Sequence, residues 1–182
     1  MPTLRIVLLC VGAAILYGVA QDHVTARVCV EYFTVAHPPI FGGITSPTLL
    51  AFGWGVIATW WMGVFLGIPL AVFARSGRRP KLEARDLMRP IGRLLIAMAV
   101  LSALAGLVGY VLGRSAFGDA LGYFAPISDQ LPKARRPLFF ADAFAHEMAY
   151  ASGGLGGVVI WAWAWWRRGK LARSMARPST SV

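Results

Sequence analysis

The stretch LLAFGWGVIATWWMGVFLGIPLAVFA, residues 49–74, decides the class of this protein. It contains no charged residue, and it is longer than the roughly 20 apolar residues with which an α-helix crosses a bilayer. The segment that follows, RSGRRPKLEARDLMR at residues 75–89, is strongly basic. An uncharged run that ends in a basic segment is typical of a helix that crosses a membrane and ends on its cytoplasmic side.

The composition of the whole chain agrees with a membrane protein. Of the 182 residues, 57% are hydrophobic and 14% are charged, whereas a soluble domain carries about 25% charged residues. The chain therefore lacks the polar surface that a water-soluble domain needs. Its net charge of +10 is compatible with nucleic-acid binding, but basic residues of membrane proteins collect in cytoplasmic loops. We therefore expect the lipid bilayer, and no nucleic acid, as its partner.

Four apolar runs predict an all-α integral membrane protein, a four-helix transmembrane bundle that forms a single domain over residues 1–182. The runs cover residues 4–20, 49–74, 90–113 and 138–166. They leave loops at 21–48, 75–89 and 114–137, and a tail at 167–182. Glycine pairs spaced four apart inside the runs, such as Gly63 and Gly67, are expected to let helices approach closely, within one chain or between two copies.

The basic residues predict the orientation of these spans. Thirteen of the eighteen Lys and Arg residues lie on the face that holds the loop 75–89 and the tail 167–182. By the positive-inside rule this face is cytoplasmic, so both termini are inside and the loops 21–48 and 114–137 are outside. The tryptophans between Trp161 and Trp166, just before the basic tail, would form an aromatic belt at the same face.

The first run has two interpretations. Its short basic start, its apolar core and the small residues Gly18, Val19 and Ala20 before Gln21 resemble a signal peptide with a cleavage site. The alternative is an anchor that is not cleaved. Gln21 emerges on the outer side in both cases, so the topology of the rest of the chain is the same.

The fourth run carries the most specific polar pattern. Asp142, His146 and Tyr150 recur every four residues and share one helix face, and Glu147 is next to His146. Ionisable groups at membrane depth generally face the bundle interior or a water-filled cavity, so these side chains are candidates for a polar pocket. In the alternative interpretation, Asp142 caps the helix start and the other side chains lie in the headgroup layer.

The second polar segment is QDHVTARVCVEYFT, residues 21–34. Its β-branched content predicts an irregular or extended stretch over the outer mouth of the bundle. This segment and the start of the fourth run reach the same membrane face, so we expect Asp22, Glu31 and His146 to form one site. A buried carboxylate there needs a partner, for which Arg27 and His146 are the candidates.

A transition metal is a second hypothesis for this face, because His23, Glu31 and His146 could supply nitrogen and oxygen ligands. No tight ligand motif supports it, and each residue can equally be a hydrogen-bonded polar group near the interface. Thiol redox chemistry is excluded, because Cys10 and Cys29 are too far apart for a disulfide and no Cys-x-x-Cys motif occurs. Coupled transport is disfavoured, because the interior of the second and third runs offers only Thr59, Ser102 and Tyr110 as polar groups.

Several of these residues carry a resemblance to a known family. Asp22, Thr25, the Glu31-Tyr32-Phe33-Thr34 segment, His146, Tyr150 and Gly153-Gly154 resemble a family of small, uncharacterised bacterial four-helix integral membrane proteins. That family typically has a His-Asp-Gln start and a proline before Glu-Tyr-Phe-Thr, so this chain departs from it at Gln21, His23 and Val30. The resemblance implies a multi-pass protein of the bacterial inner membrane, and it implies no biochemical activity.

The sequence thus predicts a membrane protein with a polar small-ligand or metal-binding site at its outer mouth. The candidate ligand-binding residues are Asp22, Glu31, Asp142, His146, Glu147 and Tyr150. The alternative function is a non-catalytic structural or accessory subunit that packs in a homo-oligomer or a larger membrane complex. No pattern in the sequence indicates a reaction, which argues against an enzyme.

Overall fold

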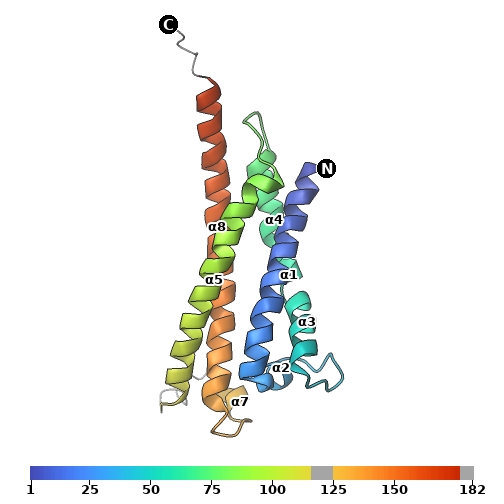
Figure 1. Cartoon of the computed structure of the whole chain (residues 1–182), viewed down its shortest axis with the longest axis vertical. Helices are drawn as coiled ribbons and strands as arrows, with labels where there is room; N and C mark the ends of the chain where they lie inside the picture. The colour runs from blue at the N-terminus through green and yellow to red at the C-terminus, as the bar shows by residue number, and fades with distance from the viewer. Residues whose placement is uncertain (116–124, 177–182) are drawn as a thin grey trace.

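The computed structural model describes residues 1–115 and 125–176, and these residues contain α-helices and no strand. Three long helices, α1 (Pro2–Val28), α5 (Ala84–Gly113) and α8 (Arg136–Met175), extend along the molecule (Figure 1). Helices α3 (Pro47–Ile57) and α4 (Trp60–Arg75) follow each other beside α1. The short helices α2 (Val30–Val35) and α7 (Ala125–Ser128) lie at the opposite end of the molecule from the N-terminus.

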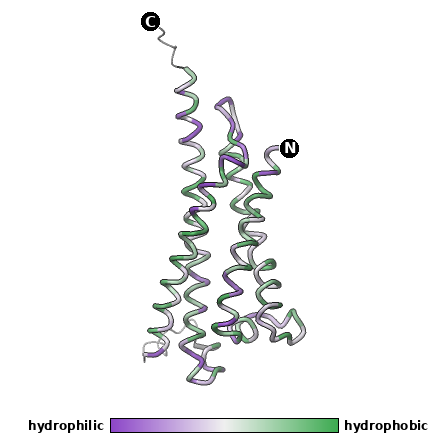
Figure 2. Tube along the Cα trace, in the orientation of Figure 1, coloured by the Kyte–Doolittle hydropathy of each residue, from purple (hydrophilic) through white to green (hydrophobic). Residues whose placement is uncertain are grey.

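Three segments are long and apolar enough to cross a membrane, so the protein is a membrane protein. They are Pro2–Val28, Pro47–Arg75 and Ala84–Gly113, with mean hydropathies of 2.1, 2.0 and 2.3. Figure 2 shows hydrophobic residues along these helices and hydrophilic residues at the loop between α4 and α5. Helix α8 is not among the three segments, because its central part is rich in glycine and tryptophan, which contribute little hydropathy.

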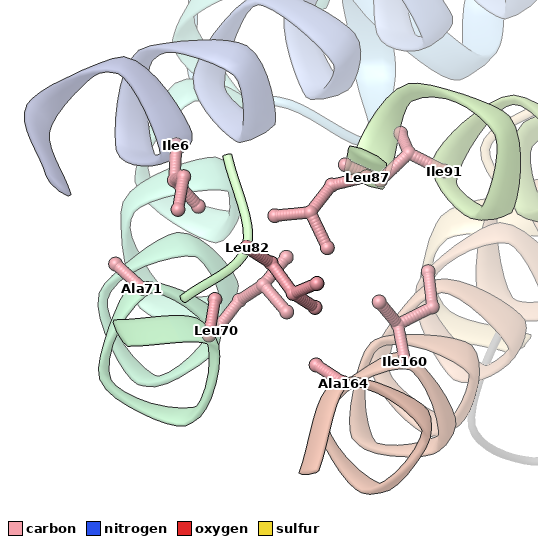
Figure 3. Packing of buried hydrophobic residues seen from close by; sticks show 9 residues of the cluster. Ile6, Leu70, Ala71, Leu82, Leu87, Ile91, Ile160 and Ala164 are labelled. Atoms are coloured by element: carbon pink, nitrogen blue, oxygen red, sulfur yellow. The ribbon is translucent and has the colours of Figure 1, made fainter. Parts of the chain in front are cut away.

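The helices pack through close contacts between neighbours. Helix α1 lies against α3 and α4, α5 lies along α8, and contacts of α4 with α8 and of α1 with α5 complete the bundle. At the end that carries the loop between α4 and α5, Ile6, Leu82, Leu87 and Ile160 form an apolar cluster (Figure 3). The guanidinium of Arg168, 1% exposed, donates hydrogen bonds to four carbonyl oxygens of residues 73–80 and fixes this loop.

Glycines allow the closest of these approaches. A Cβ atom on Gly63 of α4 would lie 2.5 Å from the Cα atom of Val11 on α1. A Cβ atom on Gly109 of α5 would collide with the backbone of Phe140 on α8. These glycines therefore bring helices of one chain together.

The segment 21–34 is helical, so the prediction of an irregular or extended stretch there is wrong. Helix α1 continues past Ala20 to Val28, and α2 begins at Val30. Asp22, Thr25 and Cys29 recur at helical spacing and are all buried. Packing of this face outweighs the β-branched content on which the prediction relied.

The other boundaries differ less. The run 49–74 is interrupted at Ala58 and Thr59, where α3 ends and α4 begins. Helix α5 begins at Ala84, so it takes in the second part of the predicted loop 75–89. Helix α8 continues through the first part of the predicted tail 167–182. Residues 116–124 of the predicted loop 114–137 and residues 177–182 of the tail lie outside the described residues.

Candidate ligand-binding site

A half-open cavity of about 150 Å³ runs along the bundle, between α1, α4, α5 and α8. One part of its lining, here called the polar end, lies beside α2 and consists of Gln21, Asp22, Tyr32, His37, His146 and Tyr150. Further along the same helices the lining consists of apolar side chains, here called the apolar end: Leu66, Leu70, Leu94, Leu95 and Ile160. The cavity therefore changes from polar to apolar along the bundle.

The polar end is centred on a buried pair formed by Asp22 of α1 and His146 of α8. His146 Nε2 lies 3.1 Å from Asp22 Oδ1, and the two side chains are 13% and 8% exposed. His146 Nδ1 lies 2.7 Å from the carbonyl oxygen of Asp142. A carbonyl oxygen only accepts hydrogen bonds, so Nδ1 carries a hydrogen. The contact between Nε2 and the carboxyl group then requires one further proton, on either the imidazole or the carboxyl group.

Aromatic rings cover this pair. The ring of Tyr32 stacks on the imidazole of His146 with centroids 4.5 Å apart, and Phe33 contacts the same imidazole edge-on at 5.7 Å. His37, which follows α2, packs against Phe33 and against Trp54 of α3. Burial raises the pKa of Tyr32 and lowers the pKa of His37, so the phenol keeps its proton and the second imidazole stays neutral near pH 7.

Glu31 belongs to a separate ion pair. Arg135 donates from Nε to Oε1 at 2.8 Å and from Nη2 to Oε2 at 2.6 Å, which is a bidentate contact. These bonds hold the pKa of Glu31 at about 2, and burial raises the pKa of the neighbouring Cys29 thiol to about 12. Glu31 thus joins α2 to the start of α8. Its partner is Arg135, and the prediction that Arg27 or His146 is its partner is wrong. Of the predicted site of Asp22, Glu31 and His146, the structure pairs Asp22 with His146, and Glu31 binds Arg135 instead.

The remaining candidates of the fourth run have different roles. Asp142 is 1% exposed and does not cap its own helix, whose N-cap is Arg135. Its Oδ2 atom is buried without a hydrogen-bond partner. The hydroxyl of Tyr150 donates to the carbonyl oxygen of Ala58, at the interruption between α3 and α4. Glu147 is exposed.

The three proposed metal ligands have different partners. His23 Nδ1 contacts the carbonyl oxygen of Val19, and its ring lies edge-on to Phe52. Glu31 is bound by Arg135, and His146 by Asp22. Within residues 1–115 and 125–176, no group of three or more His, Cys, Asp or Glu side chains is arranged to hold a metal ion.

The candidate residues do not include Gln21, Tyr32 and His37 of the polar end, nor Trp54, which also lines the cavity. The amide of Gln21 donates to the carbonyl oxygen of Ala145, and the indole N–H of Trp54 is buried without a partner. Helical spacing could have identified Gln21, because it continues the line Ala14, Gly18 along the cavity side of α1. His37 lies in a turn after α2, where no periodic signal exists.

No family model matches the chain, and neither a curated protein nor a solved structure is significantly similar to it. The geometry of the site defines its chemistry. It combines hydrogen-bonding groups, one of them an imidazole–carboxyl pair, with a long apolar lining inside a membrane protein. Such a combination is suited to binding an organic molecule, because ligand sites are largely apolar with a few well-placed polar groups.

Proposed function

We propose that the protein binds a small organic ligand in its interior cavity, with the polar group of the ligand at the Asp22–His146 pair. The buried pair that lines a cavity carries this proposal. Two helices far apart in sequence supply its members, and both are removed from water at a cost in free energy. Buried ionisable groups in membrane proteins usually mark a functional site.

The residues that line the cavity support binding over simple packing. Ala13, Ala14 and Ala149 line it, at positions where leucine or phenylalanine would fill the space of an ordinary bundle core. The space is therefore a consequence of small side chains supplied by two helices. A protein that only needed to pack four helices would gain stability from larger residues at these positions.

The proposal includes the topology expected from the sequence. Helix α8 would be the fourth span, since it is 40 residues long and packs along α5. The N-terminus lies at the same end of the molecule as the basic loop between α4 and α5 (Figure 1). This arrangement is consistent with cytoplasmic termini in a bacterial inner membrane, with α2 and the polar end of the cavity on the outer side.

Small molecules that co-purify with the protein test the proposal. We expect mass spectrometry of an organic extract from the purified protein in nanodiscs to detect a ligand that Asp22→Asn loses at least about tenfold, because the loss of a buried polar partner costs about 1–3 kcal/mol. Glu83→Gln is the control, since Glu83 is exposed at the other end of the bundle. Extracts of wild type and of folded Asp22→Asn that are identical would contradict the proposal.

The second candidate function is an accessory subunit of a larger membrane complex. It is favoured by α8, which projects beyond the other helices at the basic end and carries exposed Lys170 and Arg173 there (Figure 1). Truncation of the projecting end of α8 tests this function. If the truncated protein no longer co-purifies with a partner protein but still yields the same extracted ligand, the chain has both functions.

A further inference from the structure

We propose that the ligand is an uncharged amphiphile with a single hydrocarbon tail, its hydrogen-bonding head at the polar end and its tail along the apolar end. This inference rests on the proposed function and specifies its ligand class. It is carried by the length of the cavity, by the change in its lining and by the charge balance around Asp22 and His146.

The cavity is long for its volume. Its lining on α1 extends from Asp22 to Cys10, which at 1.5 Å per residue is about 18 Å. On α8 it extends from His146 to Ile160, which is about 21 Å. A compact cavity of about 150 Å³ holds one benzene molecule. The lining extends over three to four helical turns on both helices, so the space is elongated, and an elongated space suits one flexible chain better than a fused ring system or a lipid with two tails.

The lining past the polar end favours a hydrocarbon. Leu66 and Leu70 of α4 face Leu94 and Leu95 of α5 across the apolar end, with Ile160 of α8 beside them. No charged side chain lines this part of the cavity in the described residues. A cavity with apolar walls stays dry, and an alkyl or isoprenoid chain fills it without loss of hydrogen bonds.

The charge balance at the polar end favours an uncharged head. Asp22 and His146 share one proton, so together they carry no net charge. The nearby carboxylate of Glu31 is neutralised by Arg135. A charged head would be buried without a counter-ion, at a large cost in free energy. A hydroxyl or carbonyl head would instead exchange neutral hydrogen bonds with the Asp22–His146 pair.

Ala14 is the position at which the tail can be tested separately from the head. It lines the cavity two turns from Asp22, and its side chain leaves the space through which a tail would pass. Ala14→Leu would narrow the cavity there and leave the polar end intact. Ala20→Leu is the matched control, since Ala20 is on the same helix and is exposed on the outside of the bundle. Ala14→Val is the milder variant if Ala14→Leu does not fold.

The experiment uses two long-chain alcohols, one with a photoreactive diazirine next to the hydroxyl and one with the diazirine near the methyl end. With the protein in nanodiscs, we expect the first probe to label peptides that contain Tyr32 or His146, and the second to label peptides that contain Leu66 or Leu94. Ala14→Leu should reduce labelling by the second probe at least about tenfold, because the leucine side chain would occupy the space that the tail needs. Ala20→Leu should leave the labelling unchanged.

The outcomes separate the two proposals. If Asp22→Asn loses the extracted ligand but the methyl-end probe labels residues on the outside of the bundle alone and does not respond to Ala14→Leu, the tail proposal is overturned and the proposed function stands. If neither the extract nor the labelling depends on Asp22, both proposals are overturned. Deep labelling that is lost in Ala14→Leu and in Asp22→Asn supports both.

Discussion

Hydrogen-bond geometry at Asp22 and His146 makes each residue depend on the other. His146 is fixed by the carbonyl oxygen of Asp142 on one side and by Asp22 on the other, under the ring of Tyr32. Removal of one partner leaves the other buried and unpaired, which costs more than the hydrogen bond itself contributes. The two residues should therefore act as a unit in stability as well as in binding.

A double-mutant cycle measures this dependence. We expect Asp22→Ala and His146→Ala each to lower the free energy of unfolding by about 1–3 kcal/mol, and the double variant to lose less than the sum, with a coupling of about 0.5–3 kcal/mol. Thermal or denaturant unfolding in detergent gives the values. Asp22→Ala combined with Glu83→Gln, at the far end, is the additive control. Additive losses for Asp22 and His146 would show that the pair is not coupled.

The ion pair of Glu31 and Arg135 predicts a pH dependence. The pKa of Glu31 is about 2 in the folded protein against a usual 4.5, so its contribution to stability is complete above pH 4.5 and is lost as the pH falls through about 2. Wild type should therefore melt above Glu31→Gln at pH 7, and the difference should shrink as the pH falls from 4.5 towards 2. The exposed Glu147→Gln serves as control. A difference that is constant from pH 7 to the acid limit would contradict the assignment.

The sequence predicts that Asp22 lies close to His146, because the end of the first helix and the start of the fourth meet at one membrane face. Arg135 as the partner of Glu31 does not follow from the sequence. Arg135 lies outside the apolar run, between Pro132 and Pro137, where no periodicity indicates the direction of a side chain. The predictable part of the site is thus the part carried by long helices.

Glycine residues allow the closest contacts between the helices. Gly63 of α4 lies against the backbone of Val11 on α1, whereas Gly154 of α8 has no atom within 4 Å of a Cβ position. A methyl group at the first site must displace a helix backbone, and at the second it meets open space. A comparison of alanine substitutions at the two glycines therefore distinguishes the helix propensity of alanine from its effect on helix packing.

Gly63→Ala and Gly154→Ala should change stability in opposite directions. Alanine favours a helix over glycine by about 1 kcal/mol, so Gly154→Ala should be neutral or stabilising. Gly63→Ala should lose about 1–3 kcal/mol net of that gain, because overpacking forces α1 and α4 apart. Unfolding in detergent compares the two variants. If Gly63→Ala is as stable as Gly154→Ala, the close approach of α1 and α4 is not a determinant of the bundle.

The sequence predicts the positions of helices where apolar runs are long. It does not predict them where local residue preferences and tertiary packing favour different structures. The run 49–74 gave a helical segment near its observed position, but nothing in it distinguishes Ala58 and Thr59 as an interruption. The β-branched residues of segment 21–34 predict an extended stretch, and that prediction is wrong. The burial of Asp22, Thr25 and Cys29 on one helix face is a property of the folded bundle that the local sequence does not indicate. Tertiary packing decides such segments.

The distribution of charge along the molecule predicts its orientation in the membrane. The exposed basic residues of the loop between α4 and α5, such as Arg78 and Lys81, lie at the same end as the N-terminus (Figure 1). At the other end, Glu31 pairs with Arg135 and Asp129 with Arg136. An excess of unpaired basic charge at one end favours retention of that end in the cytoplasm.

Cysteine labelling in intact cells tests this orientation. In a background in which Cys10 and Cys29 are replaced by alanine, we expect Thr45→Cys, exposed near α2, to react with an impermeant thiol reagent from outside. Ser76→Cys, exposed in the basic loop, should react after the membrane is permeabilised and not before, because the positive-inside rule holds that loop in the cytoplasm. The two positions are each other's control for expression and for reagent access. Reaction of Ser76→Cys in intact cells, with protection of Thr45→Cys, would reverse the topology and place the Asp22–His146 end of the cavity on the cytoplasmic side, where its ligand would have to be a cytoplasmic or inner-leaflet molecule.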